Sequence, residues 1–166
     1  MKIEEKQNKL IIYLNKNNNL KIDLNNKINL EKKFQELFSK IKKIYAIDMS
    51  GSFEITIYNN EYYGNIIEIE KEELEYFEYY DTIDMKITLS KYNEILYKME
   101  NIEKNISKKS KIYTYNGEIY LKPLKNQLIG LLEENGEIIY GKKSYDILKK
   151  AKEVHKVDKK IQNMYN

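Results

Sequence analysis

The spacing of apolar residues predicts short strands and one helix in the first half of the chain. Leu10–Leu14 and Leu20–Leu24 are predicted as paired strands. Asparagine tolerates the left-handed backbone of a tight turn, so Asn17-Asn18-Asn19 favours a hairpin between them. Asn29 is placed to cap a helix whose apolar residues recur at helical spacing: Leu30, Phe34, Leu37, Phe38 and Ile41. Further strands are predicted over residues 45–49, 53–58 and 62–70.

The second half repeats this mixture of patterns. A strand is predicted over Thr82–Thr88 and a helix from about Ser90, with one apolar face made of Tyr92, Ile95, Leu96, Met99 and Ile102. Asn116-Gly117 favours positive φ at both turn positions, so it predicts a hairpin of residues 111–115 and 118–122. Asn135-Gly136 predicts a second hairpin of residues 128–132 and 137–140, and a closing helix is expected from Ser144 to Met164.

Together these elements predict an α+β fold. It would have two β-α-β-β-β-like halves, antiparallel sheets packed by helices, and a helix at the C-terminus. The halves resemble each other, because Lys21-Ile22-Asp23-Leu24 and Thr82-Ile83-Asp84-Met85 each precede a predicted helix. A chain of 166 residues suits a single domain over residues 1–166, with two pseudo-repeated halves, about 1–80 and 81–166, as a further division.

Composition narrows the class of protein. Apolar residues make up 42% and charged residues 33%, which is typical of a globular chain. The absence of cysteine excludes a disulfide framework and a thiolate metal site. No apolar run approaches the roughly 20 residues that span a bilayer, and the N-terminus lacks an apolar signal segment. We therefore expect a cytoplasmic protein of a bacterium or a bacterial host cell, an origin that the abundance of residues with A/T-rich codons also suggests.

No catalytic constellation stands out, so the sequence predicts a protein that is not an enzyme. His155 is the only histidine, and it lies in a lysine-rich predicted helix where a surface role is the simpler interpretation. Phosphate-binding loops, nucleophile elbows and zinc-ligand spacings are missing from the sequence. Glu68, Glu70 and Glu72 would form a flat row on a strand, which does not converge on a metal ion. Neither a metal nor a cofactor is expected.

The most unusual feature is an acidic, tyrosine-rich segment. Residues 61–84 carry nine acidic side chains against one lysine, in a chain whose net charge is +3. Tyrosine is enriched at interface hot spots, and carboxylates steer basic partners. The candidate partner-binding residues are Glu68, Glu70, Glu72, Glu75, Tyr76, Glu78, Tyr79 and Asp81. The simpler interpretation is that Tyr76, Phe77 and Tyr80 pack into the core while the acids are solvated.

The predicted closing helix offers a second candidate surface. Its lysines lie largely off the apolar stripe, and the candidate nucleic-acid contacts are Lys149, Lys152, Lys156 and Lys159. A solvated helix face would explain the same pattern.

One resemblance to a known family points towards protein binding. A tyrosine-rich hairpin over Ser110–Leu121 is followed by Glu133-Glu134-Asn135-Gly136 and a closing helix. This order resembles the C-terminal half of the MecA-type protease adaptors, although the chain lacks a stretch that the family carries between those elements. The resemblance implies a protein that binds other proteins.

These observations lead to one main hypothesis and two alternatives. The main hypothesis is a non-enzymatic inhibitor whose acidic, tyrosine-rich surface blocks a basic, nucleic-acid-handling protein. A phage or mobile-element protein of the anti-CRISPR kind fits that description. The alternatives are a nucleic-acid-binding protein that uses the lysine-rich C-terminal helix, and a protease-adaptor-like protein. No membrane partner is expected.

Overall fold

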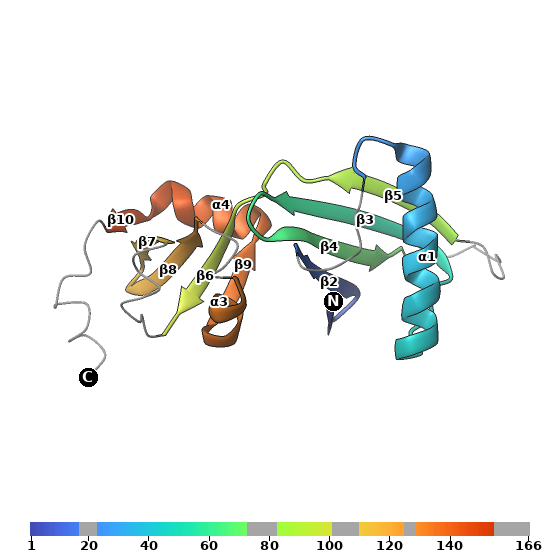
Figure 1. Ribbon diagram of the computed structural model, residues 1–166, viewed down its shortest axis with the longest axis horizontal. Coiled ribbons are helices and arrows are strands. Elements are labelled where there is room, and N and C mark those ends of the chain that lie inside the picture. The colour runs from blue at the N-terminus through green and yellow to red at the C-terminus, as the bar shows by residue number, and fades with distance from the viewer. Residues whose placement is uncertain (17–22, 73–82, 101–109, 125–128, 155–166) are drawn as a thin grey trace. The chain divides into compact units, whose positions relative to one another are not determined.

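A computed structural model describes residues 1–16, 23–72, 83–100, 110–124 and 129–154 (Figure 1). The fold is α+β, with three helices and two mostly antiparallel five-stranded sheets in this part of the chain. The chain divides into two compact units, Met1–Ile57 with Ile66–Leu89, and Tyr58–Asn65 with Ser90–Asn166. Across these residues, no helix combines the length and apolar character needed to cross a membrane.

The first unit contains a sheet with the strand order β1-β2-β4-β3-β5. Its strands are β1 (Lys2–Lys6), β2 (Lys9–Asn15), β3 (Gly51–Asn60), β4 (Gly64–Lys71) and β5 (Ile83–Leu89). β1 and β2 are antiparallel, and Gln7 takes a left-handed backbone (φ 53°) in the tight turn that joins them. β5 runs parallel to β3, with Phe53 opposite Met85. Leu10–Leu14 is therefore a strand as predicted, although its hairpin partner precedes it in the chain.

Helix α1 (Lys27–Tyr45) covers one face of this sheet (Figure 1). The five apolar residues at helical spacing are all buried, as predicted, and they pack against alternate residues of the strands, including Ile12, Ile55 and Ile67. The prediction of Asn29 as the cap was wrong, because the Asn26 side chain accepts a hydrogen bond from the Asn29 amide at 3.2 Å. One face of the sheet is therefore turned away from α1.

One predicted strand in this unit is wrong, and another falls largely outside the described residues. Residues 17–22, which include most of the predicted strand Leu20–Leu24, are outside the described part of the chain, and Leu24 lies in a turn. The predicted strand over residues 45–49 is absent. Tyr45 is the last residue of α1, Ala46 takes a left-handed backbone at the C-cap, and residues 46–50 form no strand. Asp48 belongs to this irregular stretch and lies shortly before the start of β3.

The second unit contains an antiparallel sheet with the order β10-β7-β8-β6-β9. Its strands are β6 (Ile95–Met99), β7 (Ser110–Tyr115), β8 (Glu118–Pro123), β9 (Gly136–Tyr140) and β10 (Lys152–Val154). The predicted turn Asn116-Gly117 joins β7 to β8, and both residues have positive φ (51° and 76°). Its helices are α3 (Ile129–Asn135) and α4 (Gly141–Lys150).

Two element predictions in this unit were wrong, and a third was confirmed only in part. The expected helix from Ser90 is strand β6, in which four of five residues are buried between β8 and β9. The expected strand over residues 128–132 overlaps α3 instead. The closing helix predicted from Ser144 to Met164 is confirmed over residues 144–150 of α4. Residues 152–154 instead form β10, which pairs Glu153 with Tyr113, and residues 155–164 lie outside the described part of the chain. For β6 and β10, a sheet partner distant in sequence decides the structure.

Candidate functional site

The candidate site lies on the face of the first sheet that is turned away from α1. Ile67 and Ile69 of β4 pack into the core beneath α1. Side chains alternate along a strand, so Glu68 and Glu70 lie on the opposite face. The same alternation places Glu54 of β3, between buried Phe53 and Ile55, on that opposite face. Acidic residues from neighbouring strands thus share one surface.

Glu72, just after β4, is joined to the start of β3. The Ser52 hydroxyl donates to the Glu72 carboxylate at 2.7 Å, and the Glu72 amide donates to the Ser52 carbonyl at 2.9 Å. Ser52 is also opposite Asp84 on β5. Two carboxylates therefore flank β3 at the end of the sheet where β3 begins.

Lysines balance part of this charge within the sheet. Lys86 of β5 donates to Glu54 at 2.6 Å, and this hydrogen bond raises the pKa of Lys86, with the charges of Glu54 and Glu72 adding to the effect. Lys9 of β2 lies 3.2 Å from Glu70, and this contact raises the Lys9 pKa. These pairs are exposed, so each contributes little to stability.

Charge on this face changes from one edge of the sheet to the other. Toward the β1 edge, Lys2 and Lys6 both pair with Glu4 at 2.7 and 3.2 Å, and the Tyr13 hydroxyl donates to the same carboxylate at 3.1 Å. Hydrogen bonding, chiefly from Lys2, lowers the pKa of Glu4. The strands β4, β3 and β5 carry an excess of acid on this face: Glu54, Glu68, Glu70, Glu72 and Asp84 against Lys86. Glu72 and Ile83, the described residues that flank segment 73–82, belong to this acidic side of the sheet.

We call the group Glu54, Glu72 and Asp84 the acidic end of the sheet. The chain leaves the sheet after Glu72 and re-enters it at Ile83, which is opposite Gly51, the first residue of β3. Both ends of the segment over residues 73–82 are therefore attached beside the start of β3. The sequence of that segment contains four acidic residues, Glu73, Glu75, Glu78 and Asp81, which lie outside the described residues.

The structure places three of the predicted partner-binding residues. Glu68, Glu70 and Glu72 lie on or directly after β4, on the face opposite α1. The other five lie outside the described residues: Glu75, Tyr76, Glu78, Tyr79 and Asp81. Sequence reasoning missed Glu54 as a member of the site. The position of Glu54 between Phe53 and Ile55 predicts the face of the sheet on which it lies. It does not predict the strand order, which brings Glu54 beside β5.

The predicted lysine surface is divided between two elements. Lys149 is exposed in the last turn of α4, whereas Lys152 is exposed on β10. Lys156, Lys159 and His155 lie outside the described residues. The one continuous basic helix face expected from the sequence is therefore interrupted at Ala151, which weakens the argument for a phosphate-binding stripe.

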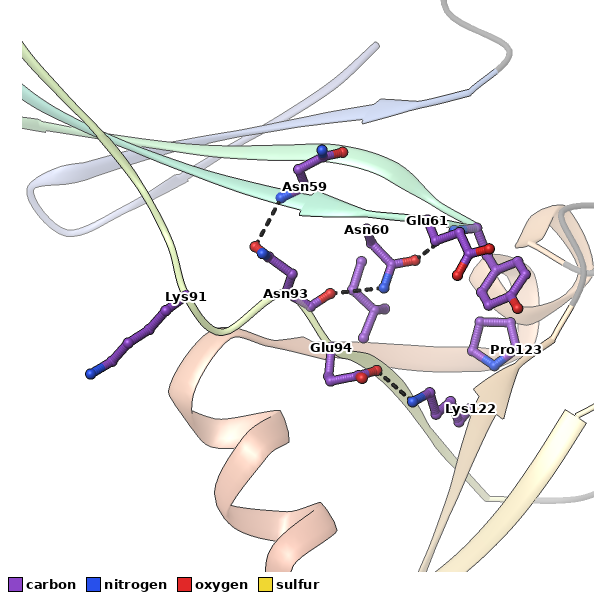
Figure 2. A pocket seen from close by; sticks show the side chains of 10 residues that line it. Asn59, Asn60, Glu61, Lys91, Asn93, Glu94, Lys122 and Pro123 are labelled. Carbon is purple, nitrogen blue, oxygen red and sulfur yellow. Dashed lines mark hydrogen bonds and ion pairs between the residues drawn. The ribbon is translucent and has the colours of Figure 1, made fainter. Parts of the chain in front are cut away.

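A second, separate recess lies in the second unit (Figure 2). It has a volume of about 310 Å³, near the lower limit of small-molecule pockets. Its lining combines buried Ile95 and Pro123 with polar side chains, and Lys122 and Glu94 form an ion pair at 2.7 Å. Figure 2 shows Lys91 pointing away from this pair.

Asparagines build one wall of this recess. Asn60 is buried, and its side-chain oxygen accepts from the amides of Tyr62 and Tyr63, both at 3.0 Å. Its side-chain nitrogen donates to the Asn93 carbonyl at 2.8 Å, while the Asn93 side chain accepts from the Asn59 amide at 3.1 Å (Figure 2). These bonds hold the β3–β4 turn against residue 93. The asparagines thus have a structural role, and no catalytic role follows from the geometry.

Within the part of the chain that the structure describes, no three His, Cys, Asp or Glu side chains are grouped so as to hold a metal ion. Comparisons with protein-family models, curated proteins and solved structures find no match to this chain. The functional argument therefore rests on the charge and geometry of the surfaces just described.

Proposed function

We propose that this protein acts without catalysis, by binding a basic protein through the acidic end of the first sheet and the attached segment. The observation that carries the proposal is the attachment of that segment. Residues 61–84 hold nine acids and one lysine, and both ends of segment 73–82 join the sheet beside Glu72 and Asp84. The described carboxylates of Glu54, Glu72 and Asp84 therefore lie at the end of the sheet where this acidic segment of the sequence begins and ends.

Such a concentration of charge favours association with a basic partner. Carboxylates close together create a negative potential that raises the rate of encounter with lysine- and arginine-rich surfaces. Tyrosines in the same segment supply apolar area with a polar tip, which suits interface hot spots. A protein that handles nucleic acid has a groove shaped for phosphates, and a cluster of carboxylates can occupy it. We infer inhibition by occlusion, of the kind used by phage or mobile-element anti-defence proteins.

The proposal is tested with two charge-neutralised variants and a matched control. The sheet variant carries Glu54→Gln, Glu72→Gln and Asp84→Asn. The segment variant carries Glu75→Gln, Glu78→Gln and Asp81→Asn. The control carries three substitutions at exposed positions of the second unit: Glu100→Gln, Glu134→Gln and Glu137→Gln. All three variants lose the same charge, so a difference between them reports the position of the acids.

The first probe is a fluorescently labelled ten-residue arginine peptide, whose binding is followed by anisotropy over a range of salt. We expect both test variants to bind about tenfold or more weakly than the wild type, and the control to change little. Equal losses in all three variants would show that only net charge matters, and the proposed site would be wrong. Labelled DNA and RNA serve as the opposing probes. Retardation of nucleic acid in place of the peptide would favour the nucleic-acid-binding alternative.

A further inference from the structure

A small groove lies in the first unit, between the β1–β2 turn, the stretch before β3 and the end of β4. Its volume is about 180 Å³. That is smaller than the roughly 300–1,000 Å³ of small-molecule pockets, and corresponds to about six water volumes, so it suits one side chain. Its floor consists of buried core residues: Leu10, Met49, Phe53 and Ile69. Charged residues line its rim: Glu5, Lys9, Asp48 and Lys71.

The chain's own Lys71 lies along this rim. Its ammonium is 3.5 Å from the Asp48 carboxylate and 6.0 Å from the centre of the Phe53 ring. Its stem passes over Gly51, where an added Cβ would lie 3.3 Å from the Lys71 Cε. Gly51 also has φ +111°, a backbone conformation that other residues rarely adopt. The rim of the groove therefore already carries an aliphatic stem that ends in a cation.

Lys71 is held loosely, whereas Asp48 is held firmly. Both side chains of the Lys71–Asp48 pair are about half exposed (49% and 61%), so little free energy opposes their separation. Asp48 is fixed independently by Ser50, whose hydroxyl lies 2.8 Å from both carboxylate oxygens and whose amide donates at 3.2 Å. Asp48 thus keeps its orientation when Lys71 moves away.

The charges that remain on the rim favour a cation. Lys9 is engaged by Glu70 at 3.2 Å on the adjacent strand, so it contributes little positive potential to the groove. Once Lys71 is displaced, the charged lining residues are Asp48, Glu5 and Lys9, and Lys9 is already paired with Glu70. An aliphatic stem can lie on the apolar floor while its charged end meets these carboxylates.

We propose that this groove is the anchor site for one arginine or lysine side chain of the protein partner, which displaces Lys71. The inference rests on the proposed function, because it supplies a specific contact at the same end of the sheet, on the side that faces α1. The partner's stem would lie over Met49 and Phe53, and its charged group would meet Asp48. A guanidinium would stack on the Phe53 ring and bond the carboxylate through two N–H groups, so arginine is expected to bind better than lysine.

The test is a titration that needs no identified partner. Capped tripeptides with a central arginine, lysine or citrulline are added to ¹⁵N-labelled protein, and amide shifts are followed by NMR. The arginine and lysine peptides should move the amides of Asp48, Ser50 and Gly51 in a saturable way. Citrulline has nearly the shape of arginine without its charge, so the citrulline peptide should not shift these amides. Equal binding of citrulline would overturn the proposal.

Two variants make the test specific. Lys71→Met keeps the stem and removes the resident cation, so the arginine peptide should bind about two- to fivefold more tightly. Asp48→Asn keeps the bonds from Ser50 possible and should abolish saturable binding. If Lys71→Met binds no better than the wild type, Lys71 does not compete and the inference is wrong. Both variants should retain the wild-type circular dichroism spectrum.

These outcomes separate the inference from the proposed function. If the sheet variant loses the ten-residue arginine probe while Asp48→Asn binds it normally, the acidic end is the interface and the groove is not an anchor. If the groove binds arginine but the sheet and segment variants behave as the control does, the groove is a site and the proposed function fails.

Discussion

Replacing Tyr97 with phenylalanine removes one oxygen atom, and we expect it to raise the free energy of unfolding. Tyr97 lies on β6 with no exposed surface, and its hydroxyl has no hydrogen-bond partner among the described residues. Burial, with a smaller effect from the charge of Glu133, raises the pKa of this phenol well above its ordinary value, so it stays neutral. A buried hydroxyl without a partner costs about 1–3 kcal/mol, and Tyr97→Phe should recover much of that.

Tyr120 provides the matched control for this substitution. It lies on the adjacent strand β8 and is 4% exposed, but its hydroxyl donates to Glu118 at 2.5 Å. Tyr120→Phe should therefore lower the free energy of unfolding by about 1 kcal/mol. Both variants are measured by urea unfolding followed by circular dichroism, with the slopes compared to confirm that the same surface is exposed. Equal destabilisation by the two substitutions would refute the reasoning.

Two further predictions concern the second unit. Asn60→Ala removes three hydrogen bonds, including one to the buried Tyr63 amide, and should lower the free energy of unfolding by about 2–3 kcal/mol. Asn59→Ala, at an exposed position, should change it by less than about 0.5 kcal/mol, and urea unfolding of both variants checks the difference. The hydrogen bond from Lys98 lowers the pKa of the Glu118 carboxyl in the folded protein. The stabilisation from this hydrogen bond is therefore present above the pKa that Glu118 has in the unfolded chain, and it is lost as the pH falls through the lower pKa of the folded protein. Glu118→Gln should flatten the acid limb of a stability–pH curve, and an unchanged limb would contradict this.

The sequence allowed prediction of α1, which buries one face, and it misled at β6, which is buried on both faces. α1 was predictable because its apolar residues, such as Phe34 and Phe38, follow one stripe while the rest of the helix is exposed. β6 was misread because Ile95, Leu96 and Met99 fit helical spacing equally well. Only the pairing with β8 and β9, distant in sequence, resolves that ambiguity.

The candidate site was partly predictable for the same reason. The alternation of Glu68 and Glu70 with buried isoleucines fixed the face of β4 on which they lie. The contribution of Glu54 and Asp84 depends on the strand order β4-β3-β5 and on the parallel pairing of β3 with β5. No local pattern encodes that order. Lys9 and Lys86, which balance part of the acid, were missed because they come from strands separated in sequence from β4.

The most direct test of the central claim is capture of the partner by the wild type, the sheet variant, the segment variant and the charge-matched control. Each tagged protein is incubated with nuclease-treated lysate of the source cells, and the co-eluting proteins are identified and quantified. We predict one basic, nucleic-acid-handling protein with the wild type and the control, and its loss in both test variants. Retention of that protein by the sheet and segment variants would contradict the claim that the acidic end of the sheet binds the partner.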